Sequence, residues 1–259
     1  MKKIGWYLTI LFFSIISFFL THKTTNYLKQ KDKLMLFLKN IEDEYYQKPL
    51  TPVIENDTIV PGLNGYRINV DKSYNRLKKV GSFNEQLLVY DQIKIKDSLS
   101  NYQDKYIISG NPKKKMVSIL LYSDELVDLD VPLNYIVSYS NLNDLSKLIK
   151  EKDNILIYNI NEDNFNNASK LLSKQKNRYC FNEDKDNDYK NICYQNNYYS
   201  ISTSVITNNY LNNIKKNLRS GSLIVLKGNY KKELNLIINY IYAKGFIIAN
   251  LDTHLNENI

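Results

Sequence analysis

Near the end of the chain, the apolar positions change their spacing twice. Leu223–Leu226 is a short apolar run after a Ser-Gly pair, which predicts a buried strand. Apolar residues then recur at helical spacing, at Leu234, Ile237, Ile238 and Ile241. Gly245 stands where a helix would end in a left-handed cap, and Phe246–Leu251 continues as an apolar strand. Residues 219–252 therefore predict a strand–helix–strand unit.

The same alternation fills the chain from about Lys115 onward. Apolar runs predict further strands at Val117–Leu121, Leu133–Val137, Asn154–Tyr158, Arg178–Phe181 and Tyr198–Ser202. Helical spacing predicts helices at Leu142–Glu151, Asp163–Gln175, Asn187–Gln195, Asn209–Leu218 and Lys231–Ala243. Strands that are separated by helices of this length pair in parallel, so the pattern predicts a parallel α/β domain.

At the N-terminus, Lys2 and Lys3 precede an uncharged run from Ile4 to Leu20. Its length is at the lower edge of the roughly 17–25 residues that cross a bilayer. A cleaved signal peptide would show a small-x-small site after the apolar core, and this run is not followed by one. A retained anchor is therefore favoured over a cleaved leader. Lysines flank the run on both sides, so charge alone does not fix its orientation.

The next segment predicts a stalk and then a small module. Residues 26–46 carry apolar positions at helical spacing, which predicts a stalk helix, with a short coiled coil as the alternative. Pro49 and Pro52 end it. In the module, Tyr66–Val70 and Leu87–Ile95 predict extended segments. Between them the sequence predicts a helix over Lys72–Val80, with Asp71 as its N-cap and Gly81 as its stop.

Composition adds the limits of size and charge. The chain has 259 residues, 43% of them apolar, which is enough for one sizeable α/β domain with appendages. Its net charge of +8 can indicate nucleic acid, anionic lipid or an acidic wall polymer as the partner. The competing interpretation is compositional bias, since the chain is rich in Lys, Asn, Ile and Tyr. No motif indicates nucleic-acid binding.

The two cysteines, Cys180 and Cys193, are close in the sequence. Outside the cell such a pair forms a disulfide; two reduced thiols buried in a core are the alternative. Without histidines nearby, the pair does not make a zinc site.

The strand–helix–strand wording of residues 219–252 resembles the last unit of the polysaccharide deacetylase (NodB-homology) family. The phrase that begins PGLNGYRINVDKSYNRLKKVG, within residues 60–98, resembles the preamble of membrane-anchored deacetylases from Gram-positive bacteria. The resemblance implies an irregular (β/α) barrel with its site at the carboxyl ends of the strands. It also implies an extracytoplasmic domain that works on the cell wall, carried by a single membrane span.

In that family an aspartate and two histidines hold a divalent metal, a second aspartate is the base, and a late histidine protonates the leaving amine. The base and the metal aspartate match Tyr122 and Ser123 here, and Asp124 follows one position late. The two metal histidines match Tyr158 and Glu162. The resemblance therefore implies that the base and most of the metal ligands are lost.

The remaining family positions are Lys227, which matches the late histidine, and Arg178, which matches the arginine of an Arg-Pro-Pro-Tyr-Gly segment. The chain has only two histidines, His22 beside the anchor and His254 in the tail. We therefore expect no catalytic residue and no bound metal. A residual site would consist of Asp124, Glu162, Arg178 and Lys227.

Together these observations predict four parts: an anchor at 1–22, a stalk and linker at 23–58, a small α+β module at 59–107 and a deacetylase-like barrel at 108–259. The expected function is that of an inactive deacetylase-like protein that binds peptidoglycan, another wall glycan or a partner protein, with no cofactor. The alternative is an active N-deacetylase with a rebuilt zinc site, and a purely structural envelope protein is a third interpretation.

Overall fold

The computed structural model describes residues 2–258, apart from the side chains of residues 2–5 and 7–10. The chain divides into two compact units. The smaller unit is the chain up to Lys48 together with Gly65–Lys94, and the barrel unit is Pro49–Asn64 together with the chain from Ile95 onward. The predicted module 59–107 is thus divided between the two units, because Thr58–Val60 pairs in parallel with Tyr106–Ile107 in the barrel sheet.

The smaller unit packs helices against a two-stranded antiparallel sheet. Its elements are α1 (Lys2–Lys31), α2 (Lys33–Asn40), η1 (Glu42–Tyr45), β3 (Gly65–Ile68), α3 (Val70–Val80), η2 (Glu85–Leu87) and β4 (Tyr90–Ile93). The predicted stalk helix is interrupted at Asp32, whose carboxylate accepts a hydrogen bond from the Leu34 amide and caps α2. Helix α3 is capped by Asn69 and not by the predicted Asp71, while Gly81 ends it with a φ of 80° as predicted.

The predicted membrane anchor falls on α1. The side chains of residues 2–5 and 7–10, which include six of the 17 residues of the apolar run, lie outside the described part of the structure. Among the residues that are described, no helix combines the length and the apolar character that a bilayer crossing needs.

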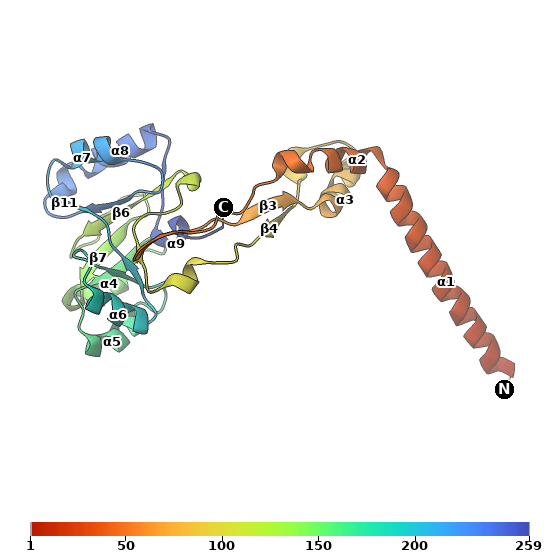
Figure 1. Cartoon of the computed structure of the whole chain (residues 1–259), viewed down its shortest axis with the longest axis horizontal. Coiled ribbons are helices and arrows are strands. Elements are labelled where there is room, and N and C mark those ends of the chain that lie inside the picture. The colour runs from red at the N-terminus through yellow and green to blue at the C-terminus, as the bar shows by residue number, and fades with distance from the viewer. Residues whose placement is uncertain (1, 259) are drawn as a thin grey trace. The chain divides into compact units, whose positions relative to one another are not determined.

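The barrel unit alternates strands and helices (Figure 1). Its strands are β1 (Val53–Glu55), β2 (Thr58–Val60), β5 (Tyr106–Ile107), β6 (Met116–Tyr122), β7 (Asn134–Ser138), β8 (Asn154–Tyr158), β9 (Tyr179–Phe181), β10 (Tyr199–Ile201), β11 (Val205–Ile206), β12 (Leu223–Leu226) and β13 (Ile247–Ile248). Its helices are η3 (Leu99–Tyr102), η4 (Pro112–Lys114), α4 (Tyr139–Leu148), η5 (Glu162–Asn164), α5 (Phe165–Leu171), α6 (Asn187–Gln195), α7 (Tyr210–Asn217), η6 (Tyr230–Lys232), α8 (Leu234–Ala243) and α9 (Leu251–His254).

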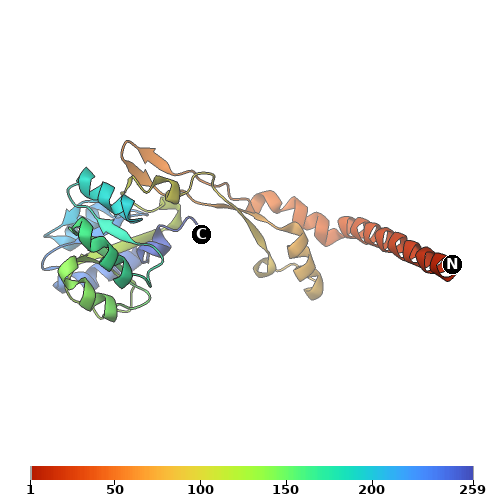
Figure 2. The same cartoon turned by 90° about the horizontal axis from the view of Figure 1, so that it is seen from below.

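The strands form one curved sheet in the order β1-β2-β5-β10-β9-β8-β7-β6-β12-β11, with β13 beside β6. Every pair from β2 to β11 is parallel, and only the β1–β2 hairpin, the orange pair of arrows in Figure 2, is antiparallel. The predicted parallel α/β fold is therefore confirmed. The sheet path ends at β1 and β11, which leaves the barrel open at one seam.

The sheet separates two apolar cores. Residues Ile119 and Leu121 of β6 face the outer core, where α4, α5, α7 and α8 cover the sheet, while Leu120 and Tyr122 face the barrel interior. This alternation follows from the two-residue period of a strand. Because both faces are covered, the strands are apolar at nearly every position, as parallel strands require.

The chain end closes the amino end of the barrel. The predicted strand Phe246–Leu251 is mostly not a strand: β13 covers two residues and α9 begins at Leu251. Asn250 causes the change, because its side chain accepts a hydrogen bond from the Thr253 amide and starts the helix. At this amino end, the Ser118 hydroxyl donates a hydrogen bond to the Ala249 carbonyl. The hydroxyl oxygen therefore accepts a hydrogen bond from Nδ1 of the fully buried His254, 2.8 Å away.

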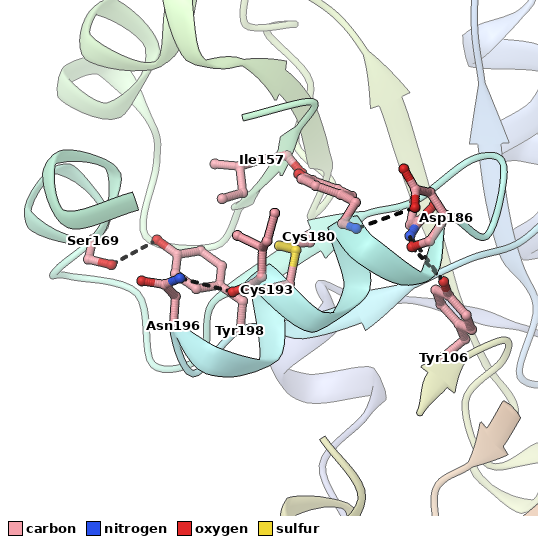
Figure 3. Close-up of a disulfide and its surroundings, with 11 residues drawn as sticks. Tyr106, Ile157, Ser169, Cys180, Asp186, Cys193, Asn196 and Tyr198 are labelled. Carbon is pink, nitrogen blue, oxygen red and sulfur yellow. Dashed lines mark hydrogen bonds between the residues drawn. A yellow bond between two sulfur atoms is a disulfide. The ribbon is translucent and has the colours of Figure 1, made fainter. Parts of the chain in front are cut away.

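A disulfide joins the sheet to a covering helix. Cys180 on β9 and Cys193 on α6 are bonded, and both side chains are fully buried (Figure 3). The disulfide predicted from the sequence is thus present. Nearby, the Tyr198 hydroxyl lies 3.1 Å from Oγ of Ser169 and links α5 to the same layer.

Candidate ligand-binding site

The carboxyl ends of four parallel strands meet at one edge of the barrel unit. Tyr122 ends β6, Tyr158 ends β8, Phe181 ends β9, and Lys227 follows β12. The register places Leu226 of β12 beside Leu121 of β6, and Tyr158 of β8 beside Phe181 of β9. Carboxyl ends of parallel strands are where α/β barrels build their sites.

We call this edge the mouth of the barrel, and its floor consists of aromatic rings. The ring of Tyr122 packs edge to face against Tyr158, with centroids 5.4 Å apart, and against Phe181, with centroids 5.7 Å apart. The ammonium of Lys227 lies 4.7 Å from the centroid of the Tyr122 ring, within the range of a cation–π interaction. Tyr122, Tyr158 and Lys227 therefore come together, as the resemblance implies.

Glu183 joins this group, although no sequence motif marked it as a site residue. Its Oε2 accepts hydrogen bonds from the Tyr122 hydroxyl at 2.8 Å and from Nζ of Lys227 at 2.9 Å. Glu183 follows Phe181 by two residues, so a carboxylate just after a strand end was the available signal. Asn182 holds this turn, since its side chain bonds to the backbone N–H and C=O of Asp186.

The electrostatics of the group favour a fixed ion pair. The hydrogen bond to Glu183 raises the pKa of Lys227 above its ordinary value. Partial burial opposes ionisation of Glu183, but the hydrogen bonds from Lys227 and Tyr122 outweigh it and lower the pKa of that carboxyl. Burial and the adjacent carboxylate raise the pKa of Tyr122 far above its usual range. At neutral pH the mouth therefore holds an ammonium, a carboxylate and a neutral phenol.

Above this floor lies a cavity of about 570 Å³. Its rim carries Asp124, which accepts a hydrogen bond from the side-chain amide of Asn141, and Glu125, which pairs with Lys231 at 2.9 Å. Tyr230 braces the rim by donating to the Tyr122 carbonyl at 2.9 Å. The volume and the mixture of rings with a few polar groups are typical of small-ligand sites.

The predicted site residues do not all reach this mouth. Ser123 and Asp124 line the cavity, whereas Glu162 is absent from its lining and lies in η5, after the end of β8. Arg178 directly precedes β9, and Lys227 directly follows β12. Because the strands are parallel, Arg178 lies at the opposite edge of the sheet from Lys227 and does not take part. His254 lies at the amino end of the barrel, opposite the mouth.

The residues at the mouth do not fit a divalent metal. Zinc prefers thiolate, imidazole or carboxylate ligands, and the positions that match the family's ligands are Ser123, Tyr158 and Glu162. Glu183 is the one carboxylate beside the aromatic floor, and its Oε2 is already engaged by the Lys227 ammonium and the Tyr122 hydroxyl, so it is not free to serve as a metal ligand. Within the described residues, no group of three His, Cys, Asp or Glu side chains could hold a metal ion.

A second cavity, of about 670 Å³, lies at the open seam of the barrel between the end of β5 and β11. Its lining includes Ser109, Thr203 and Ser204, with Lys216 and Arg219 as its charged residues. It shares no lining residue with the mouth, so variants can separate the two cavities.

The fold is that of the CE4 family of polysaccharide deacetylases, as comparison with solved structures shows. A Bacillus anthracis CE4 family pseudoenzyme, BA3943, superposes with a TM-score of 0.64 at 16% identity, over 88% of this chain and 96% of that one. A mutant of BA3943 with restored enzymatic activity gives a TM-score of 0.66 at 16% identity, over 88% of this chain and 99% of that one.

Sequence comparisons reach less far. The uncharacterized protein YlxY of Bacillus subtilis (strain 168) is 35% identical over 107 residues, which cover 40% of this chain. The match spans about a third of YlxY, 34% of its length. No family model matches the sequence.

Proposed function

We propose that this protein is a membrane-anchored, deacetylase-like protein without catalytic activity, and that the mouth of its barrel binds a cell-wall glycan. The observation that carries the proposal is the Lys227–Glu183 pair on the aromatic floor. It lies at the strand ends where the resemblance places a base, metal ligands and an acid. A fixed ion pair and a neutral tyrosine supply neither a metal-activated water nor a free base.

The mouth suits a sugar chemically. Sugars present apolar C–H faces together with hydroxyl groups, so they bind to aromatic rings bordered by polar groups. The ring of Tyr158 is half-buried, and the carboxylate of Asp124 and the amide of Asn141 lie on the rim of the cavity. A mouth of this kind can hold a glycan by contacts alone, without a reaction.

The anchor is part of the proposal. The large apolar side chains that are described in α1, among them Leu11, Phe13 and Phe18, are 58%, 64% and 70% exposed. A helix with exposed apolar residues around its circumference suits lipid better than water. The proposal places the barrel unit outside the membrane, where a wall glycan would be its ligand.

The test is glycan binding and acetate release by the full-length chain. We expect binding to peptidoglycan fragments or to β-1,4-linked glucosamine oligomers, and no release of acetate with zinc, cobalt or manganese added. Tyr158→Ala should abolish binding, while Arg219→Gln at the seam cavity should leave it unchanged. Binding that is lost only in Arg219→Gln would move the site to the seam and contradict the proposal.

The active-enzyme alternative makes the opposite prediction. Metal-dependent acetate release that is lost in Asp124→Ala or Glu162→Ala would show that the site has been rebuilt. Since Glu162 does not line the cavity, we expect neither the activity nor its loss.

A further inference from the structure

The charges at the mouth do not cancel, and the remainder is negative. The cavity lining carries the carboxylates of Asp124 and Glu125 and the ammonium groups of Lys227 and Lys231, and a third carboxylate, that of Glu183, pairs with Lys227 from outside the lining. Lys227 pairs with Glu183 at 2.9 Å, and Lys231 pairs with Glu125 at 2.9 Å. Among the described residues, no ammonium or guanidinium group pairs with Asp124.

Asp124 is nevertheless held in place. Its Oδ1 accepts a hydrogen bond from the side-chain amide of Asn141 in α4, and the residue is exposed on the cavity rim. A neutral amide fixes the position of a carboxylate without neutralising its charge. The carboxylate thus faces the cavity with its charge uncompensated, on a chain whose net charge is +8. Because the chain as a whole is positively charged, it does not attract cations in general. A preference for a cation must therefore come from the local charge of Asp124.

We infer that the mouth binds amino sugars that carry a free ammonium group, in preference to their N-acetylated forms. This inference rests on the proposed function and names the form of the glycan. An ammonium can donate a charge-assisted hydrogen bond to Asp124, and such bonds are about twice as strong as neutral ones. An acetamide offers one neutral N–H and no charge. The two lysines do not oppose the ligand strongly, since each is already paired with a carboxylate.

The ligand is then the de-N-acetylated segment of a glucosamine polymer. The aromatic floor of Tyr122 and Tyr158 receives the sugar, and Asp124 at the rim selects the nitrogen substituent. The protein would then recognise glycan from which acetyl groups have already been removed, so a deacetylation reaction by another protein must supply its ligand.

The experiment is a titration of the full-length chain with two tetramers, one of β-1,4-glucosamine and one of β-1,4-N-acetylglucosamine. At pH 6 most of the free amines are protonated, while the carboxylate of Asp124 is ionised. We expect about tenfold tighter binding of the glucosamine tetramer. The ratio should fall with added salt, because the contact is partly exposed. Chemical N-acetylation of the same glucosamine sample should remove its advantage.

Asp124→Asn should bring the two tetramers to equal affinity, since it removes the charge and keeps the shape. Asp144→Asn makes the same change at an exposed position of α4 that does not line the cavity, and it should keep the full ratio. Equal binding of both tetramers by the unaltered chain, or a ratio unchanged in Asp124→Asn, would overturn the inference and leave glycan binding intact. Failure of both tetramers and of peptidoglycan to bind would instead refute the proposed function.

Discussion

At the scale of single residues, Lys227 determines what the mouth can do. A histidine at this strand end could exchange a proton near neutral pH, whereas a lysine bonded to a carboxylate stays protonated. The aromatic rings of Tyr122 and Tyr158 pack edge to face, at positions where two carboxylates would repel each other. The chemistry of the mouth therefore depends on a few side chains, while the strands that carry them keep the fold.

Glu183→Gln tests the ion pair. The variant leaves the Lys227 ammonium without its carboxylate, so the pKa of Lys227 should fall towards its ordinary value. Since the Lys227 side chain is 42% exposed, solvent screening limits the loss of stability to about 1 kcal/mol. Urea unfolding would measure the free energy, and NMR titration of the lysine would measure the pKa.

The matched control is Glu125→Gln, which breaks the exposed pair with Lys231. No measurable loss of stability is expected there. Equal losses in the two variants would mean that the Glu183 pair has no special role at the mouth.

His254 should make the stability of the protein depend on pH. Burial, with a smaller contribution from the charge of Lys114, lowers the pKa of His254 to about 3. The unfolded chain binds this proton near pH 6.5, and the folded chain does not. The free energy of unfolding should therefore decrease as pH falls below 6.5, by about 1.4 kcal/mol per unit for one proton.

The variant His254→Asn keeps a donor for Ser118 and cannot titrate. We expect it to be less stable at pH 7 but to lose stability less steeply between pH 6.5 and 5 in urea unfolding experiments. A slope equal to that of the unaltered chain would show that other groups produce the acid sensitivity.

At the scale of the elements, helix caps set several boundaries. Asn69→Ala removes the side chain that accepts from the Lys72 amide, so it should cost about 1 kcal/mol in thermal or urea unfolding. Asp71 is the position that the sequence predicted as the cap. The variant Asp71→Ala removes only the ion pair between Asp71 and Lys29, and since the Asp71 side chain is 69% exposed, we expect a smaller loss of stability. A larger loss in Asp71→Ala than in Asn69→Ala would reverse this assignment.

The disulfide closes the segment between β9 and α6, and this segment contains Glu183. Cys180 and Cys193 are 13 residues apart, so removing the bond should cost about 3 kcal/mol through the greater freedom of the unfolded chain. Thermal unfolding of Cys180→Ala/Cys193→Ala would measure it. A double variant as stable as the unaltered chain would mean that packing alone holds α6 on β9.

At the scale of the whole molecule, the chain crosses between its two units more than once. Residues 49–64 belong to the barrel unit although the sequence on both sides of them belongs to the smaller one. Apolar spacing reports only the local period of a segment, and it carries no information on which distant strand will accept that segment. The predicted domain boundaries at 59 and 108 therefore differ from the compact units.

The sequence by itself determined the parallel α/β architecture and nearly every strand between Val117 and Leu226, because apolar periodicity records which residues must be buried. It also indicated the aromatic and lysine positions at the strand ends and the pairing of the two cysteines. Only the tertiary structure revealed Glu183 as the partner of Lys227, separated Arg178 from the mouth and shortened the last predicted strand to two residues before a capped helix. These facts depend on parallel pairing and on contacts between residues far apart in the chain, which local spacing does not encode.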